Sequence, residues 1–314
     1  MAYVPGELRP LYGVKETNYG VTPASALDYL GELLSATPNI EPNQSVEYWS
    51  GGRSYAPASC VFERWDPALR VQVQPRVPAA GYAWMDGLVE GALGLTSGTE
   101  ALGRLPSYSM RVELTQGAVI GQYLYNGCKV NSLTISADKP GGRVLLDAEL
   151  HASYISKVGA ARAVTGLQAL TLGAGEAPPS SPPLQWRAPT TLVAGSSRTI
   201  YPQRLKVDIA NNLQRQGSSV PGADSAGYSI TTALHEGRRE ISAEVELYLE
   251  DLVIMDEMLA NQSIASLSTV IGGKTITLLN GHYIVDGGSW PELRHDVMTQ
   301  AVRMRFSSIA VAEV

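Results

Sequence analysis

The sequence is poor in the residues that most often carry chemistry. Its 314 residues include two cysteines, Cys60 and Cys128, and four histidines. Two cysteines exclude a disulfide-rich scaffold and a cysteine-based zinc site, so we expect both thiols to be incidental. The histidines show no metal-ligand spacing; they are His151, His235, His282 and His295. The sequence therefore predicts no metal and no other cofactor.

Charge and long apolar runs are also scarce. Only 17% of the residues are charged and the net charge is −6, but 44% are hydrophobic, a balance that excludes a disordered chain. A pI near 5.3 argues against a nucleic-acid-binding surface, which is usually basic. No apolar run reaches the roughly 18 residues that span a membrane. Residues 1–10 lack the basic and apolar parts of a secretory signal. We therefore expect folding in a cytoplasm and no membrane partner.

Enzyme signatures are weak. Residues 272–275, Gly-Gly-Lys-Thr, resemble the end of a phosphate-binding loop, but Ser268 stands where that motif needs glycine. A strand-like segment follows instead of a helix, so we expect a hairpin turn. His235 begins a partial zinc-protease motif, but Arg239 replaces its second histidine, and no Gly-x-Ser-x-Gly elbow is present. We predict that the protein is not an enzyme.

Alternation of apolar and polar residues is the strongest positive signal. Residues 241–249 read Ile-Ser-Ala-Glu-Val-Glu-Leu-Tyr-Leu. Because side chains of a strand alternate between its faces, this predicts a strand with one dry and one wet face. Glu244 and Glu246 then lie about 7 Å apart on the wet face, where solvation explains them better than acid–base catalysis. The pattern recurs at 69–77, 110–114, 144–150, 205–209 and 302–306. Such half-buried strands are typical of antiparallel sheets.

Helical periodicity is confined to two short segments, 82–93 and 251–260. In the first, Gly87 and Gly91 favour close packing of the helix on a strand. Each segment follows an alternating strand and precedes several more, so the two halves of the chain share one order of elements.

This repeated order predicts a mainly β fold with two tandem antiparallel β-sandwich or barrel-like modules. Each module carries a short flanking α-helix, and long loops or arms are added to them. Residues 173–183, rich in glycine and proline, read as the connection between the modules. We place the first module, with an N-terminal arm, at 1–165 and the second at 166–314.

Two segments show neither the alternation of a strand nor the periodicity of a helix. Residues 1–66 carry scattered proline, glycine and aromatic residues, and residues 210–237 separate two strong strands. A structureless stretch of that length is unusual inside a compact domain and tends to be functional. We predict a flexible N-terminal arm and a projecting loop that orders against a neighbouring subunit. Candidate contact residues of this loop are Asn211, Asn212, Gln214, Arg215, Pro221, Asp224 and Tyr228.

Three further stretches of the sequence are informative because of their residues and their order along the chain. Residues 14–20 read Val-Lys-Glu-Thr-Asn-Tyr-Gly, and residues 124–137 include Asn-Gly-Cys-Lys-Val-Asn-Ser-Leu. Residues 205–215, with an Asp-Ile-Ala-Asn-Asn-Leu core, are followed by Glu-Gly-Arg-Arg-Glu at 236–240. In kind and order these stretches resemble the major tail tube proteins of long, non-contractile-tailed bacteriophages.

The resemblance implies a structural virion protein of the phage tail that is assembled in the host cytoplasm. Such modules form rings whose sheets join into an inner wall, and the rings stack into a tube that conducts the genome. Two modules per chain imply a ring of three chains with pseudo-sixfold shape. Implied partners are further copies of the chain, the tape measure protein in the lumen, tail terminator and distal tail proteins at the ends, and DNA in transit. No sequence-specific DNA binding is implied.

The charge of the bore is the remaining question. A basic bore would bind DNA, whereas an acidic one would repel it weakly and let it slide. We expect acidic strand faces in the lumen, with Asp147, Glu149, Glu244 and Glu246 as candidates. The basic pairs Arg70 with Arg76 and Arg303 with Arg305 are then expected outside or under neighbours. The alternative for the bore is a surface close to neutral. The alternative for the function is a non-enzymatic tandem β-sandwich binding or adhesion protein of a virion.

Overall fold

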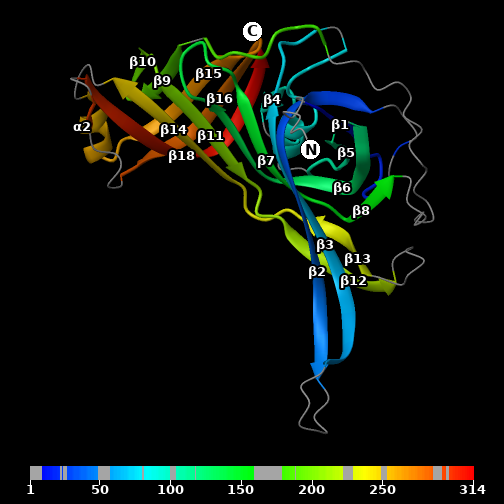
Figure 1. The fold of residues 1–314 in the computed structure, drawn as a ribbon. Helices are drawn as coiled ribbons and strands as arrows, with labels where there is room; N and C mark the ends of the chain where they lie inside the picture. Colours follow the sequence, from blue (N-terminus) through cyan, green and yellow to red (C-terminus); the bar gives the residue numbers. More distant parts are fainter. Residues whose placement is uncertain are drawn as a thin grey trace.

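The protein is mainly β, as expected, with two short helices (Figure 1). The computed structural model describes residues 9–21, 23, 27–48, 57–79, 81–99, 104–116, 118–158, 179–187, 189–221, 229–248, 253–285, 292–294 and 297–314. In this part of the chain no helix is long and apolar enough to cross a bilayer.

The first half of the chain forms a barrel-like ring of strands. Pairing runs antiparallel in the order β1–β2–β3–β7–β6–β5 and returns to β1. The strands are β1 (Arg9–Lys15), β2 (Asp28–Tyr48), β3 (Pro57–Gln74), β4 (Gly98–Thr99), β5 (Tyr108–Gln116), β6 (Ala118–Ala137), β7 (Leu145–His151) and β8 (Tyr154–Val158). Return of the pairing to β1 is a common way for antiparallel sheets to satisfy their edges.

The second half repeats this order of pairing. Its strands run β11–β14–β18–β16–β15–β9, where the first half runs β2–β3–β7–β6–β5–β1. The strands are β9 (Thr190–Ala194), β10 (Ser196–Ile200), β11 (Arg204–Ala210), β12 (Gln214–Pro221), β13 (Ser229–His235), β14 (Glu240–Tyr248), β15 (Ser263–Ile271), β16 (Lys274–Ile284), β17 (Glu292–Arg294) and β18 (Val297–Glu313). Helix α1 (Leu88–Leu93) follows β3, and α2 (Val253–Leu259) follows β14. The predicted repeat of element order is confirmed.

The two halves are joined mainly by the pairing of β6 with β11, with shorter contacts of β13 with β3 and of β18 with β4. β11 pairs antiparallel with the end of β6, from Leu205 opposite Ala137 to Ala210 opposite Ser132. A single sheet therefore runs β3–β7–β6–β11–β14–β18. One face of this sheet is apolar and belongs to the hydrophobic core; it includes Leu69, Val71, Leu146, Ala148, Leu133, Ile135, Val207, Ile209, Ala243, Val245, Val302 and Met304.

Helix α1 packs closely on this core. The helical stretch is shorter than predicted, because residues 84–87 form turns. Gly91 lies against β6, and a Cβ there would come within 2.8 Å of Val130 Cγ2. At Gly87, φ is +80° and a Cβ would come within 2.5 Å of Leu30 Cδ2. The predicted close packing of both glycines on strands is thus confirmed.

The two predicted irregular arms are hairpins instead. β2 and β3 form a long hairpin that projects from the body, and β12 and β13 form a second hairpin beside it (Figure 1). The hairpins meet in one parallel pairing, Ser229 with Arg64. A hairpin that projects from a core needs no dry face, so its sequence carries no regular alternation. For the described residues of 1–66 and 210–237, the expectation of irregular structure is therefore wrong.

The predicted turn at the Gly-Gly-Lys-Thr stretch is confirmed. Gly272 and Gly273 connect β15 to β16 with φ of +56° and +78°, and Ile271 pairs with Lys274. Positive φ at both central residues is what a tight two-residue hairpin turn requires.

A substitution at Gly91 tests the close approach of α1 and β6. Gly91→Val should lower the free energy of unfolding by about 1–3 kcal/mol, because overpacking outweighs the better helix propensity of valine. The measurement is chemical denaturation of both proteins. Adding Val130→Ala should recover part of the loss, and a double variant as unstable as the sum of the singles would contradict the contact.

Candidate functional site

The sheet shared by both halves has one polar face. Since neighbouring strands are in register, polar side chains face one another across six strands. One cross-strand row consists of Gln72, Asp147, Thr134, Asp208, Ser242 and Arg305. We call this surface, with the flanking residues of the same strands that point the same way, the polar face.

Opposite charges on the polar face are paired. Arg70 Nη2 lies 3.1 Å from Asp147 Oδ2, and Arg303 Nε lies 3.0 Å from Glu244 Oε2. Lys206 Nζ lies 2.8 Å from Asp208 Oδ2. Exposed pairs of this kind add roughly 0–1 kcal/mol of stability each. Their larger effect is to cancel charge locally, which leaves a hydrophilic surface with little net field.

All four predicted acidic residues lie on this face. Asp147 and Glu149 lie on β7, and Glu244 and Glu246 on β14; each is opposed by another residue of the polar face. The expected separation of basic from acidic faces is wrong. Arg70 lies opposite Glu149, Arg303 opposite Glu244, and Arg305 opposite Ser242. The sequence pattern of one strand does not reveal which residues the neighbouring strand places opposite it.

Arg76 does not lie on the polar face with Arg70, Arg303 and Arg305. It lies beyond the end of β3, where its Nη2 is 2.7 Å from Glu32 Oε1. Its Nη1 donates to the carbonyls of Pro179 and Ser181 at 3.2 and 2.8 Å. Arg76 therefore fastens the chain that leads into the second half instead of joining the polar face.

A second feature, which we call the arm base, joins the three stretches 14–20, 124–137 and 205–240. Glu16 is buried there and accepts hydrogen bonds from Gly20 N, Ser109 Oγ and Gly127 N, at 2.8, 2.7 and 2.8 Å. Gly127 has φ +63°, and a Cβ there would come within 2.8 Å of Ser153 Cβ. Only glycine fits this position without strain.

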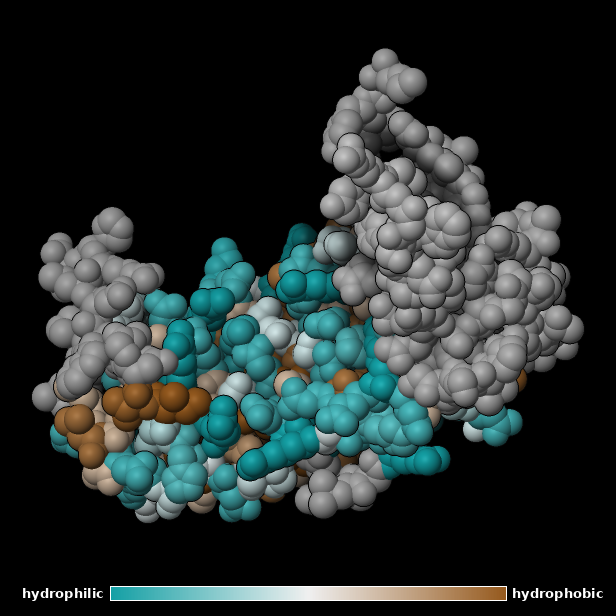
Figure 2. Space-filling view, turned by 90° about the horizontal axis from the view of Figure 1, so that it is seen from below, coloured by the Kyte–Doolittle hydropathy of each residue, from teal (hydrophilic) through white to brown (hydrophobic). Residues whose placement is uncertain are grey.

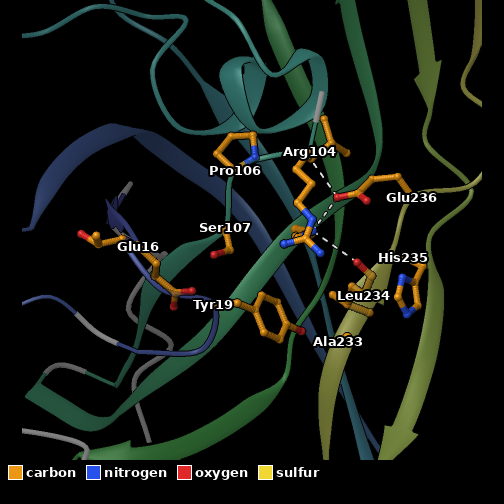
Figure 3. Close-up of a pocket in the computed structure, with 12 residues that line it drawn as sticks. Glu16, Tyr19, Arg104, Pro106, Ser107, Ala233, Leu234, His235 and Glu236 are labelled. Carbon is orange, nitrogen blue, oxygen red and sulfur yellow. Dashed lines mark hydrogen bonds and ion pairs between the residues drawn. The ribbon is translucent and has the colours of Figure 1, made fainter. Parts of the chain in front are cut away.

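Lys129 and Glu236 connect the barrel to the second hairpin. Lys129 Nζ lies 2.5 Å from Glu236 Oε1 and donates to Leu234 O at 3.2 Å. Its ammonium also lies 5.7 Å from the centroid of the Tyr19 ring. These residues line an open pocket of about 380 Å³ (Figure 3). Burial raises the pKa of Glu236, but hydrogen bonds from Lys129 and the Leu105 amide outweigh burial and leave the pKa below its usual value.

Asn211 ties the second half to helix α1. Its side chain is buried, and Nδ2 donates to Ala92 O at 3.0 Å and Val130 O at 2.9 Å. Oδ1 accepts from Arg239 Nε at 2.7 Å, and Arg239 Nη1 donates to Leu93 O at 3.4 Å. The last carbonyls of α1 are thereby satisfied by the second half of the chain.

The predicted contact residues of the second arm divide into two groups. Asn211 and Arg215 make contacts within the chain; Arg215 Nη1 lies 3.2 Å from Asp66 Oδ1 and Nη2 donates to Pro67 O at 3.1 Å. Asn212 turns the chain with φ 49°. Gln214 and Pro221 are the ends of β12. Asp224 and Tyr228 lie outside the described residues.

Within the described ranges, no group of three His, Cys, Asp or Glu side chains could hold a metal ion. Cys128 is buried and its pKa is raised by burial, so its thiol is protonated at neutral pH.

The comparison with protein families agrees with this architecture. A family model described as phage tail tube protein matches residues 6–289.

The chain belongs to the phage tail tube protein family. The match covers the whole arm base and all strands of the polar face except β18. No curated protein matches the chain. The family is structural, in agreement with surfaces built for packing and solvation.

The arm base was missed as a site by sequence reasoning, although its residues stand in the three stretches that carry the resemblance. Glu16 and Gly127 are 111 positions apart, and Lys129 and Glu236 are 107 apart. The available signal was the charge of Glu16 and Lys129 within the stretches 14–20 and 124–137. Their convergence on one point requires the fold.

Acid should weaken the Lys129–Glu236 link. Because the pKa of Glu236 is depressed below its ordinary 4.5 in the folded state, the carboxylate contributes stability above that pH. This contribution is lost as the pH falls through the folded value. The difference in unfolding free energy between the unmodified protein and Glu236→Gln should thus shrink below about pH 4.5. Denaturation at a series of pH values measures it, and a constant difference would contradict the pairing.

Proposed function

We propose that this chain forms the wall of a phage tail tube, with the polar face directed into the bore. The observation that carries the proposal is the continuity of the polar face through the β6–β11 pairing. A wall needs one wet side that continues without interruption and one dry side that packs, and this sheet has both. The protein would then be a component of the virion tail, assembled in the host cytoplasm.

The repeat supports a ring of three chains. We infer that modules 1–165 and 166–314 occupy equivalent places, so three chains give a pseudo-sixfold ring. Rings that stack head to tail use a heterologous contact, which does not close and therefore grows into a filament. Tail terminator and distal tail proteins would end this growth, and a tape measure protein would occupy the lumen during assembly.

The paired charges of the polar face suit passage of DNA. Duplex DNA carries about one negative charge per 1.7 Å of axis, so unpaired basic groups would hold it. On this face Arg70 and Arg303 are each engaged by a carboxylate. The bore would therefore be hydrophilic and close to neutral, and DNA would pass without sequence-specific binding or chemical change.

The hairpin arms are proposed as contacts between rings. Both project from the body, and the arm base fixes the second hairpin rigidly to α1 and β6 (Figure 1). Removal of residues 217–226 should leave a folded chain and rings, because the arm base is retained. Stacking into tubes should be lost. Electron microscopy and thermal melting of both proteins provide the test, and normal tubes from the shortened chain would contradict the role of the second arm.

Charge reversal on the polar face tests the bore. Tubes of Asp147→Lys should retain duplex DNA at about 50 mM salt and release it by about 200 mM, because unpaired lysines and Arg70 would face the phosphates. Unmodified tubes should retain none. Glu313→Lys makes the same change of charge on a strand end away from the polar face and should behave like the unmodified tube. Equal retention by both variants would overturn the assignment of the bore.

A further inference from the structure

The roots of the two hairpins are joined by Arg215, near the start of β12. Its Nη1 lies 3.2 Å from Asp66 Oδ1 on β3, and its Nη2 donates to Pro67 O at 3.1 Å. The carbonyl of Pro67 also accepts from Ala152 N, just after β7, at 3.0 Å. Both charged side chains are mostly buried, with 14% of Arg215 and 19% of Asp66 exposed. We call Asp66, Pro67 and Arg215 the arm junction, because they hold the second hairpin against the first where both leave the body (Figure 1).

A histidine lies beside the arm junction. His151 is the last residue of β7 and stands between Ala68 of β3 and Lys129 of β6, whose ammonium is paired with Glu236. The side chain of His151 is 16% exposed, and its Nε2 lies 3.2 Å from Glu149 Oε1. Its Nδ1 is buried, and no group among the described residues forms a hydrogen bond with it. Hydrogen bonding therefore satisfies only one of the two ring nitrogens. The outer surface beside these strands is hydrophilic (Figure 2).

This environment suits the neutral ring of His151 and not the charged one. In the neutral ring, Nε2–H donates to the carboxylate of Glu149 and the bare Nδ1 is an acceptor. A second proton on Nδ1 creates a buried donor without an acceptor, which is costly. It also places a positive charge in a mostly buried site near the guanidinium of Arg215.

Charges of both signs face His151 from the surrounding strands. Glu149 on β7 and Asp66 on β3 attract an imidazolium, whereas Arg215 on β12 repels it. Burial and the charge of Arg215 outweigh the two carboxylates, so the pKa of His151 is lowered from its usual 6.5. The ring is therefore neutral at neutral pH.

We propose that His151 is an acid-sensitive switch that controls the contact between the two hairpins. While its ring is neutral, Arg215 keeps its bonds to Asp66 and Pro67. When the ring is protonated, the repulsion of Arg215 and the unsatisfied Nδ1–H are relieved by opening of the arm junction, which admits water to both groups. The second hairpin then separates from the first beyond its base, which Asn211 still holds on α1 and β6.

The direction of the pH dependence follows from the geometry of the closed junction. Opening exposes His151 to water, so its pKa returns towards 6.5 and the open form binds the proton first. Closure is therefore fully favoured above about pH 6.5 and weakens as the pH falls below that value. The Lys129–Glu236 link weakens in a separate and more acidic range, because the pKa of Glu236 is lowered from its ordinary 4.5.

Exchange of backbone amide hydrogens measures the opening. An isolated two-stranded hairpin is marginally stable in water, so β12 and β13 should lose protection once they leave the first hairpin. His151→Gln keeps a side-chain N–H for Glu149 and stays uncharged at every pH. His282→Gln removes an exposed histidine of β16 and is the matched control. The proteins are compared with one another at each pH, which cancels the intrinsic effect of pH on exchange.

Between about pH 7 and about pH 5, the unmodified chain and His282→Gln should lose protection several-fold in β12 and β13, and His151→Gln should not. Protection that stays unchanged in the unmodified chain, or falls equally in His151→Gln, would overturn the inference.

A second measurement does not depend on the folding of His151→Gln. The ring of His151, followed by nuclear magnetic resonance during a pH titration, should have a pKa below 6.5 in the unmodified chain. Arg215→Gln removes the repelling charge and should raise this pKa. A pKa of His151 that is not lowered, or that is the same in Arg215→Gln, would overturn the inference.

The consequence for assembly rests on the proposed role of the arms between rings. Tubes of the unmodified chain and of His282→Gln should separate into rings at about pH 5, and tubes of His151→Gln should persist. Electron microscopy and sedimentation measure this. If amide exchange responds as expected but all three tubes persist, the switch is supported and the role of the arms between rings is refuted.

Discussion

The pairing of β6 with β11 is the interaction on which the rest of this structure depends. It places Thr134 opposite Asp208 and Leu133 opposite Ile209, so polar meets polar and apolar meets apolar across the joint between the halves. Because side chains alternate with a period of two, a slip of one residue would exchange the faces of every strand beyond it. The same register therefore sets both the continuous core and the continuous polar face.

The arm base turns this joint into a rigid unit. Asn211 is 1% exposed and is bonded to α1, β6 and Arg239, so the second hairpin leaves the body in a fixed direction. Buried polar networks stabilise one arrangement when every group is satisfied and are costly when one is lost. In a tube whose rings meet at the hairpins, the arm base would fix the position of the neighbouring ring relative to α1 and β6.

Sequence reasoning succeeded where one face of an element is buried. The alternation at 205–209 and 241–249 predicted β11 and β14 because burial of one face imposes a period of two. It failed for the hairpins, whose strands outside the core pair through main-chain hydrogen bonds and so require no alternation of side chains. It also failed for Arg303, whose carboxylate partner lies on another strand. The arm base was out of reach for the same reason, since Lys129 and Glu236 meet only after folding.

In the assembled tube, the polar face of the shared sheet should line a continuous bore. An image reconstruction of the assembled tube at side-chain resolution tests this directly. The side chains of Asp147, Thr134 and Asp208 should point into the lumen, with Arg70 and Arg303 beside their carboxylates. A lumen formed by other strands, with these residues on the outer surface or between rings, would contradict this orientation of the sheet.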